Sequence, residues 1–322
     1  MKLAVFRTGR EARLGVVWGE KVIDLNAGFK MLLKPPHPPR KALPIQDMRS
    51  FLAQGSTAIR MARRVEALVK RKMGDQRRVP PVLKGLVIDL NKVRLLPPIS
   101  NPPKILCLAR NYVSHAREVA GDAPLPQSLL VFMKPTTAII GPGDSVVVPP
   151  NCQKLDHEVE LAVVIGKKGR YIPSEKAMDH VAGYTIINDI SDREYIVQKE
   201  TQRVNWFFMK AQDTFAPLGP YLVLKDEIKD PRVLRLRLWV NGELRQDSSG
   251  EDMIFMIPEI ITQISRFVTL EPGDVIATGT PTGTSFSTKQ YLKAGDVVEC
   301  EIERIGRLKN FIKLEKPIYR KR

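Results

Sequence analysis

The chain of 322 residues is 43% hydrophobic, which is enough to bury a sizeable core in one large domain or in two. Its apolar runs stay well short of the roughly 20 residues that cross a bilayer, and the first residues form too short an apolar run for a signal peptide. The three cysteines lie far apart, which indicates free thiols rather than a disulfide framework or a thiolate metal site. We therefore expect a cytoplasmic protein that does not associate with membranes.

The formal net charge of +16 is high for a chain of this length. One hypothesis is that the protein binds nucleic acid. However, the basic residues are spread along the chain, and they form neither a recognised reader motif nor a pattern interleaved with aromatic residues. We therefore expect no nucleic-acid partner, and we interpret the charge as a basic surface that favours solubility and attracts small anionic molecules.

Residues 1–98 are predicted to form a small N-terminal domain that contains β-strands. A helical pattern covers residues 47–73 and ends at Gly74. Proline pairs at 97–98 and 102–103 mark a linker, so residues 99–322 are expected to form the second, larger domain. The strands predicted before the linker cover residues 2–6, 14–18, 21–25 and 87–96.

After the linker, many short strands are separated by few helices. Three Gly-Asp turns, at residues 143, 273 and 295, each precede a strand, and Asn241-Gly242 is a strong hairpin signal. The helices are expected over residues 174–180 and 257–268. This pattern predicts an α+β fold rather than a doubly wound sheet. The strands predicted here cover residues 104–108, 129–134, 184–189, 234–240, 275–278 and 297–304.

The most informative stretch is residues 156–166, with the sequence DHEVELAVVIG. Its apolar residues recur at every second position, which predicts a strand with Glu158 and Glu160 on the same face. Adjacent carboxylates repel each other unless a cation lies between them. A solvent-facing edge with two glutamates is the alternative that this stretch leaves open. His157 is predicted to point to the opposite face, so we do not count it as a ligand.

Asp189, at the end of another apolar strand, could provide a third carboxylate, although a simple turn residue is the alternative. Three carboxylates would form an all-oxygen site, which suits Mg²⁺ first, with Mn²⁺ or Ca²⁺ as alternatives. Such a site would leave positions for water and for a chelating substrate.

His115 and Glu118 lie three residues apart, so they would meet on one helical turn. A carboxylate beside an imidazole fixes its tautomer and supports it as a general base. An exposed polar turn remains the alternative. Lys210 follows an apolar and aromatic run, which favours an anionic partner only weakly. Residues 278–283 are either a plain turn or an anion-binding loop, and they lack the spacing of a P-loop.

Taken together, these motifs resemble the fumarylacetoacetate hydrolase family. The resemblance covers about residues 103–314, and the motifs follow the family's order and approximate spacing. The resembling segments are residues 107–112, 114–118, 132–135, 156–166, 183–193, 210–220, 241–246 and 278–283.

The resemblance implies a mixed β-sandwich roll of the fumarylacetoacetate hydrolase type, usually a homodimer, with a small N-terminal domain appended. It also implies that Glu158, Glu160 and Asp189 ligate Mg²⁺ near the mouth of the roll. The partner expected from the resemblance is an anionic 2-oxo acid, which chelates the metal ion through carboxylate and 2-oxo oxygens.

By the same resemblance, His115 and Glu118 would form the dyad that activates water or moves protons. Arg193, Lys210 and Thr280 would contact the carboxylate and oxo groups of the substrate, with Lys210 belonging to the catalytic set.

We therefore expect a Mg²⁺-dependent hydrolase that cleaves a C–C bond of a 2,4-dioxo acid, such as an acylpyruvate or a fumarylacetoacetate-like compound. Within the family, the alternatives are a 2-oxo acid decarboxylase and an isomerase or hydratase of aromatic-compound degradation. A non-catalytic binding protein is the alternative of another class. The chain departs from the family at Ala211-Gln212 and at Ala109, which precedes Arg110 where the family often has glycine. These departures border the pocket and bear on the identity of the substrate.

Overall fold

A strand that is buried on both faces, β11 (Val159–Ile165), lies at the centre of the fold. The protein was analysed as a computed structural model, which describes residues 1–32, 47–74, 78–195 and 204–315. In β11, Leu161 and Val163 belong to one hydrophobic core, and Ala162 and Val164 belong to a second one. The period-two alternation therefore separates two packed faces rather than a buried face from a solvated one.

The strand β11 belongs to a twelve-stranded sheet whose path runs β4-β3-β2-β1-β14-β12-β11-β17-β6-β7. Two further strands join this path, because β5 pairs with β1 and β8 pairs with β14. The other strands of this sheet are β1 (Lys2–Thr8), β2 (Glu11–Trp18), β3 (Lys21–Asp24), β4 (Val87–Asp89), β5 (Arg94–Leu96), β6 (Ile105–Ala109), β7 (Leu130–Lys134), β8 (Ile139–Ile140), β12 (Val181–Asn188), β14 (Ala216–Leu224) and β17 (Val275–Ala277).

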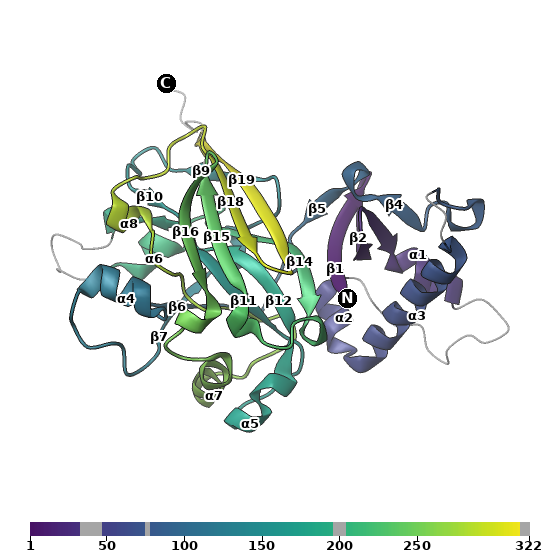
Figure 1. The fold of residues 1–322 in the computed structure, drawn as a ribbon, viewed down its shortest axis with the longest axis horizontal. Helices are drawn as coiled ribbons and strands as arrows, with labels where there is room; N and C mark the ends of the chain where they lie inside the picture. The colour runs from purple at the N-terminus through teal and green to yellow at the C-terminus, as the bar shows by residue number, and fades with distance from the viewer. Residues whose placement is uncertain (33–46, 75–77, 196–203, 316–322) are drawn as a thin grey trace, which may run out of the picture.

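A second sheet of five strands, in the order β16-β15-β18-β19-β9, packs against the first (Figure 1). Apolar residues of both sheets form one continuous core. A two-stranded sheet pairs β10 (Leu155–Asp156) with β13 (Ser191–Asp192). The five strands are β9 (Ser145–Val148), β15 (Arg235–Val240), β16 (Glu243–Ser249), β18 (Val297–Ile302) and β19 (Gly306–Leu314).

Helices are few and lie around the sheets (Figure 1). In the described parts of the chain, no helix combines the length and the hydropathy that crossing a membrane requires. The helices are α1 (Leu25–Leu32), α2 (Met48–Ala53), α3 (Ser56–Met73), α4 (Val113–Ala120), α5 (Ser174–Ala177), α6 (Trp206–Lys210), α7 (Ile257–Phe267) and α8 (Ser285–Thr288). The predicted α+β class is confirmed.

The N-terminal segment continues the large sheet instead of forming a sheet of its own. Strand β1 pairs with β14 through Lys2 and Leu3, and the second hydrophobic core extends from the N-terminal strands and α3 to β14. Figure 1 shows this segment beside β14, at one end of the molecule. The domain boundary near residue 98 stays a prediction.

Two predicted elements are wrong in their extent. The helix expected over residues 47–73 is divided into α2 and α3 at Gly55, whose φ of 55° lies in the left-handed region that interrupts a helix. The strand expected over residues 87–96 is divided by the 3₁₀ turn Leu90–Lys92 into β4 and β5. These two short strands pair with different neighbours, β3 and β1.

We predict that Leu161→Ala lowers the midpoint of thermal unfolding strongly, because a fully buried leucine leaves a cavity between the two sheets. Leu→Ala changes in cores cost about 2–5 kcal/mol. The matched control is Leu244→Ala in β16, since that leucine is 47% exposed. Equal shifts of the two midpoints would contradict the central role assigned to β11.

Candidate active site

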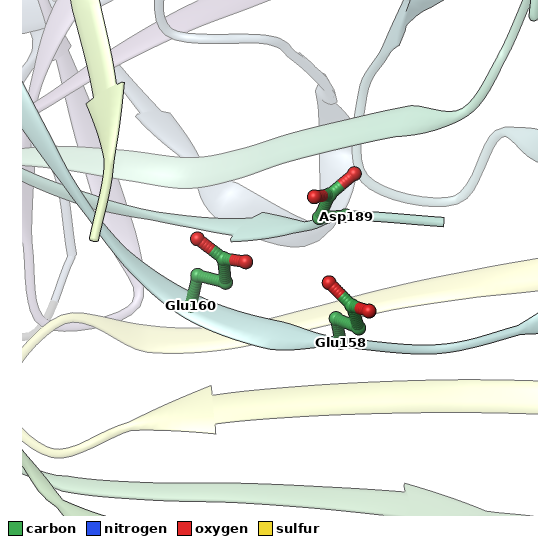
Figure 2. A group of neighbouring side chains, drawn as sticks. All are labelled: Glu158, Glu160 and Asp189. Carbon is green, nitrogen blue, oxygen red and sulfur yellow. The ribbon is translucent and has the colours of Figure 1, made fainter. Parts of the chain in front are cut away.

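Three carboxylates meet beneath the end of β11. Ligand oxygens of Glu158, Glu160 and Asp189 all lie within 4.8 Å of one another, and all three residues are buried. Figure 2 shows Glu158 and Glu160 extending from the same side of their strand toward Asp189, which follows β12. The antiparallel pairing of β11 with β12 places Val159 opposite Asn188, so the two strand ends lie side by side.

The carboxylate of Glu160 indicates that this cluster fits a cation. One of its oxygens accepts a hydrogen bond from the Gly279 amide at 2.7 Å, whereas the other is buried and has no hydrogen-bond partner among the described residues. Burial, together with the negative charges of Asp189 and Glu158, raises the pKa of Glu160 well above its ordinary value. A hard divalent ion would satisfy the free oxygen and offset the repulsion.

The carboxylate of Glu158 is paired with two cationic side chains. Lys210 donates to Glu158 at 2.7 Å and to Asp189 at 2.8 Å, and the Arg193 guanidinium donates to the other oxygen of Glu158. Burial opposes ionisation of Glu158, but Lys210 and Arg193 outweigh it and hold its pKa below the ordinary value. Glu158 therefore stays ionised in its buried position.

Arg193 is fixed by a second carboxylate, that of Asp156. The Arg193 Nε donates to Asp156 Oδ2 at 2.8 Å, and Asp156 also accepts from the amides of Ser285 and Phe286 at the start of α8. Burial opposes the ionisation of Asp156, whereas the charge of Arg193 lowers its pKa below the ordinary value. Asp156 thus sets the position of the guanidinium beside Glu158.

Lys134, the last residue of β7, adds another buried cation. Its Nζ donates to Asp189 Oδ1 and, at 3.0 Å, to the carbonyl oxygen of Ile190. Burial lowers the pKa of Lys134, and the charge of Asp189 opposes this effect. Asp189 therefore has an ammonium group on each of its oxygens, one from Lys134 and one from Lys210.

His115 and Glu118 form the expected pair on α4. The Nδ1 atom of His115 lies 3.0 Å from Glu118 Oε2, while the other oxygen of Glu118 accepts from Thr282 Oγ1 at 2.7 Å and from the Gly283 amide at 2.9 Å. Burial opposes ionisation of Glu118, but these hydrogen bonds lower its pKa overall. The ionised carboxylate orients the imidazole and leaves Nε2 available for proton transfer.

Thr280 has its hydroxyl group engaged within the protein. It donates to the Val159 carbonyl oxygen at 3.0 Å and accepts from Gln246 Nε2 at 3.0 Å. Gln246 in turn accepts from the Val159 amide. The loop of residues 278–283 is therefore bound to β11 through Thr280 and Gln246.

A cavity of about 210 Å³ adjoins these groups. One part of its lining is apolar and includes Phe132 and Trp206, whose rings stack with centroids 5.0 Å apart. The other part is polar and bears most of the side chains that the sequence had suggested. The polar side chains that line the cavity are Arg110, His115, Glu158, Arg193, Lys210 and Thr280.

The structure brings together the residues that the sequence singled out. His157 lies outside the carboxylate cluster, in agreement with the alternation along the strand. Sequence reasoning missed Asp156, Lys134 and Gln246, whose roles depend on contacts between distant segments. The signals for Lys134 were its place in the family-like segment 132–135 and its charge at the end of an apolar strand, LVFMK, and neither indicated its contact with Asp189.

Comparison with known proteins gives three further findings. The family model described as Fumarylacetoacetate (FAA) hydrolase C-terminal matches residues 104–313. The chain is 41% identical over 290 residues to "Oxaloacetate tautomerase FAHD2B, mitochondrial" of Bos taurus, a match that covers 89% of this chain and 82% of the relative. It is 39% identical over 301 residues to "Oxaloacetate tautomerase YisK" of Bacillus subtilis, covering 92% and 94% of the two chains.

Among solved structures, the fold resembles that of maleylpyruvate hydrolase from Sphingobium sp. SYK-6 in complex with manganese(II) ion and pyruvate. The TM-score is 0.71 at 31% sequence identity, and the match covers 98% of this chain and 100% of the other.

We predict that Glu160→Gln weakens the binding of Mn²⁺ and Mg²⁺ by at least about tenfold. Replacing a residue that only hydrogen-bonds to a metal ligand already lowers metal affinity by about this factor. The reason is that the substitution replaces a carboxyl group, which becomes anionic when it binds a cation, with an amide that stays neutral. Titration calorimetry measures the affinity. Asp192→Asn is the matched control, because Asp192 is also buried but lies outside the cluster of three. Unchanged affinity in Glu160→Gln would remove this residue from the metal site.

Proposed function

The chain belongs to the fumarylacetoacetate hydrolase family, and on this premise we propose that it is a metal-dependent tautomerase of a small 2-oxo acid of the oxaloacetate type. The observation that carries this proposal is a proton-transfer pair, His115 with Glu118, beside a cavity that also reaches Glu158 and Lys210. The names of the two relatives near 40% identity support the choice of reaction.

Glu158, Glu160 and Asp189 would hold the metal ion, which we propose to be Mg²⁺ or Mn²⁺. When bound, such an ion supplies Lewis-acid polarisation of the carboxylate and 2-oxo oxygens of a chelating substrate. The structure named above as a complex with manganese(II) ion supports a divalent ion in this fold.

Keto–enol conversion moves one proton between the enol oxygen and the carbon atom next to the carbonyl carbon, while the double bond shifts between C=C and C=O. No further reactant is consumed. His115 is the group that would exchange a proton with this carbon atom, because its other ring nitrogen is held by Glu118. Glu118 keeps its negative charge, so it holds the orientation of the His115 ring during the transfer.

Lys210 and Arg193 would stabilise the negative charge that develops on the enolate. Burial opposes the charge of Lys210, but Asp189 and Glu158 outweigh it and raise the pKa of this amine. Lys210 therefore acts as a fixed cation rather than as the base. The apolar rings of Phe132 and Trp206 restrict water in the cavity, which strengthens these electrostatic interactions.

Hydrolysis of a C–C bond in an acylpyruvate is the second candidate. The same dyad could remove a proton from water instead of from carbon, and the named maleylpyruvate hydrolase shares the fold. The two reactions differ in their products, since hydrolysis releases pyruvate and tautomerisation does not.

We predict that His115→Ala lowers kcat by about 10²- to 10⁴-fold, the range for loss of a general acid–base group. Glu118→Gln should lower kcat less, because it removes only the orientation and the charge that support His115. Metal affinity should survive in both variants. Asp122→Asn, an exposed carboxylate just after α4, is the control for a change of charge. Full turnover in His115→Ala would exclude the proposed proton transfer.

We also predict that the Mg²⁺-loaded protein accelerates the loss of the ultraviolet absorbance of enol-oxaloacetate above the rate in buffer. In parallel, the release of pyruvate from acetylpyruvate is measured with a coupled dehydrogenase. The kcat/KM for this hydrolysis should be at least about a hundredfold lower than that for the tautomerisation of enol-oxaloacetate. The opposite ratio of the two rates would replace the tautomerase proposal with the hydrolase.

A further inference from the structure

Arg110 lines the cavity but has no part in the mechanism derived above. It follows the last residue of β6 and precedes α4, the helix that carries His115. Its φ of 53° places it in the left-handed region, which is uncommon for a residue other than glycine. Strained backbone of this kind concentrates at functional sites, where the surrounding structure holds it in place.

The backbone next to Arg110 is fixed by its neighbour Asn111. The Asn111 side chain donates to the carbonyl oxygens of Thr278 and Phe255 at 2.8 and 3.2 Å, and it accepts from the Phe255 amide at 2.8 Å. Gly279 packs closely against this point, because a Cβ atom there would lie 3.0 Å from Asn111 Cβ. The backbone that carries Arg110 is therefore held in place by hydrogen bonds to the start of the loop of residues 278–283 and to Phe255.

Arg110 differs from the other cations of this region in that it forms no ion pair with any residue that the structure describes. Arg193, Lys210 and Lys134 are all buried and paired with carboxylates. Arg110 is exposed, and in the described parts of the chain no carboxylate lies within ion-pair distance of its guanidinium. The cavity lining thus combines two buried and paired cations, Arg193 and Lys210, with the exposed Arg110.

A substrate bound by its 2-oxo acid group beside Glu158 and Lys210 would extend its far end toward the open side of the cavity. A guanidinium recognises a carboxylate through two parallel hydrogen bonds. We propose that Arg110 binds the second carboxylate of a dicarboxylic 2-oxo acid and so selects dicarboxylic over monocarboxylic substrates. This inference rests on the proposed function for the placement of the 2-oxo acid group.

The test compares oxaloacetate with its 4-methyl ester, in which the second carboxylate is neutral while the 2-oxo acid group is unchanged. Calorimetry with the Mg²⁺-loaded protein gives the affinity for each compound, and enol decay gives kcat and KM. The variants are Arg110→Met and Arg110→Lys. Arg170→Met is the charge control, since Arg170 is exposed and does not line the cavity.

We expect Arg110→Met to weaken binding of oxaloacetate by about 10- to 100-fold, the range for a hydrogen-bonded charged group. Its KM should rise by a similar factor with little change in kcat, and affinity for the ester should stay within about twofold. Arg110→Lys should recover part of the loss, because it keeps the charge but not the fork of two donors.

Two results would overturn the inference. Equal weakening of both compounds by Arg110→Met would mean that Arg110 supports the fold of the site, and unchanged affinity for oxaloacetate would mean that it makes no contact. The outcome for the proposed function is separate. The wild-type protein could fail to accelerate enol decay while Arg110→Met still reduces the difference in affinity between oxaloacetate and its 4-methyl ester. In that case the tautomerase proposal fails and the role of Arg110 holds.

Discussion

The site depends on one electrostatic constraint, which is that carboxylates buried inside a β-sheet need cations beside them. Glu158, Glu160 and Asp189 are withdrawn from water, and an isolated buried carboxylate would be costly. Lys210 and Arg193 compensate Glu158, and Lys134 and Lys210 compensate Asp189. Of these three carboxylates, Glu160 is the one with an oxygen that has no partner in the part of the chain that the structure describes. The protein's own cations thus neutralise Glu158 and Asp189, but no cation pairs with Glu160 in the described part of the chain. A metal ion would supply the missing positive charge there.

This balance explains why the fold brings together segments that are far apart in the sequence. The carboxylates come from β11, from the residue before it and from the residue after β12, whereas the cations come from β7, α6 and the turn after β13. Each partner is supplied by a different element, so no single segment could form the site alone. The two hydrophobic cores hold these elements in register, because β11 contributes residues to both.

Much of the site could be predicted because its signals are local. The shared face of Glu158 and Glu160 follows from the period of a strand, and the contact of His115 with Glu118 follows from the spacing on a helix. The partners Lys134 and Asp156 could not be predicted, because nothing near them in the sequence reveals a contact with a distant strand. Strand β14 was missed for another reason. It contains Pro217 and Pro220, which argue against an inner strand, yet it lies between β1 and β12.

The loop after β17 has a consequence for the geometry of the reaction. Its Gly279 amide donates to Glu160, its Thr280 hydroxyl donates to the Val159 carbonyl oxygen, and its Gly283 amide donates to Glu118, which orients His115. The loop therefore sets the distance between the His115–Glu118 pair and the cluster of three carboxylates. Lengthening this loop would leave the carboxylate cluster and the His115–Glu118 pair intact but would change the distance between them. The length of this short connection is therefore more tightly constrained by the geometry of the site than the apolar wall of the cavity is.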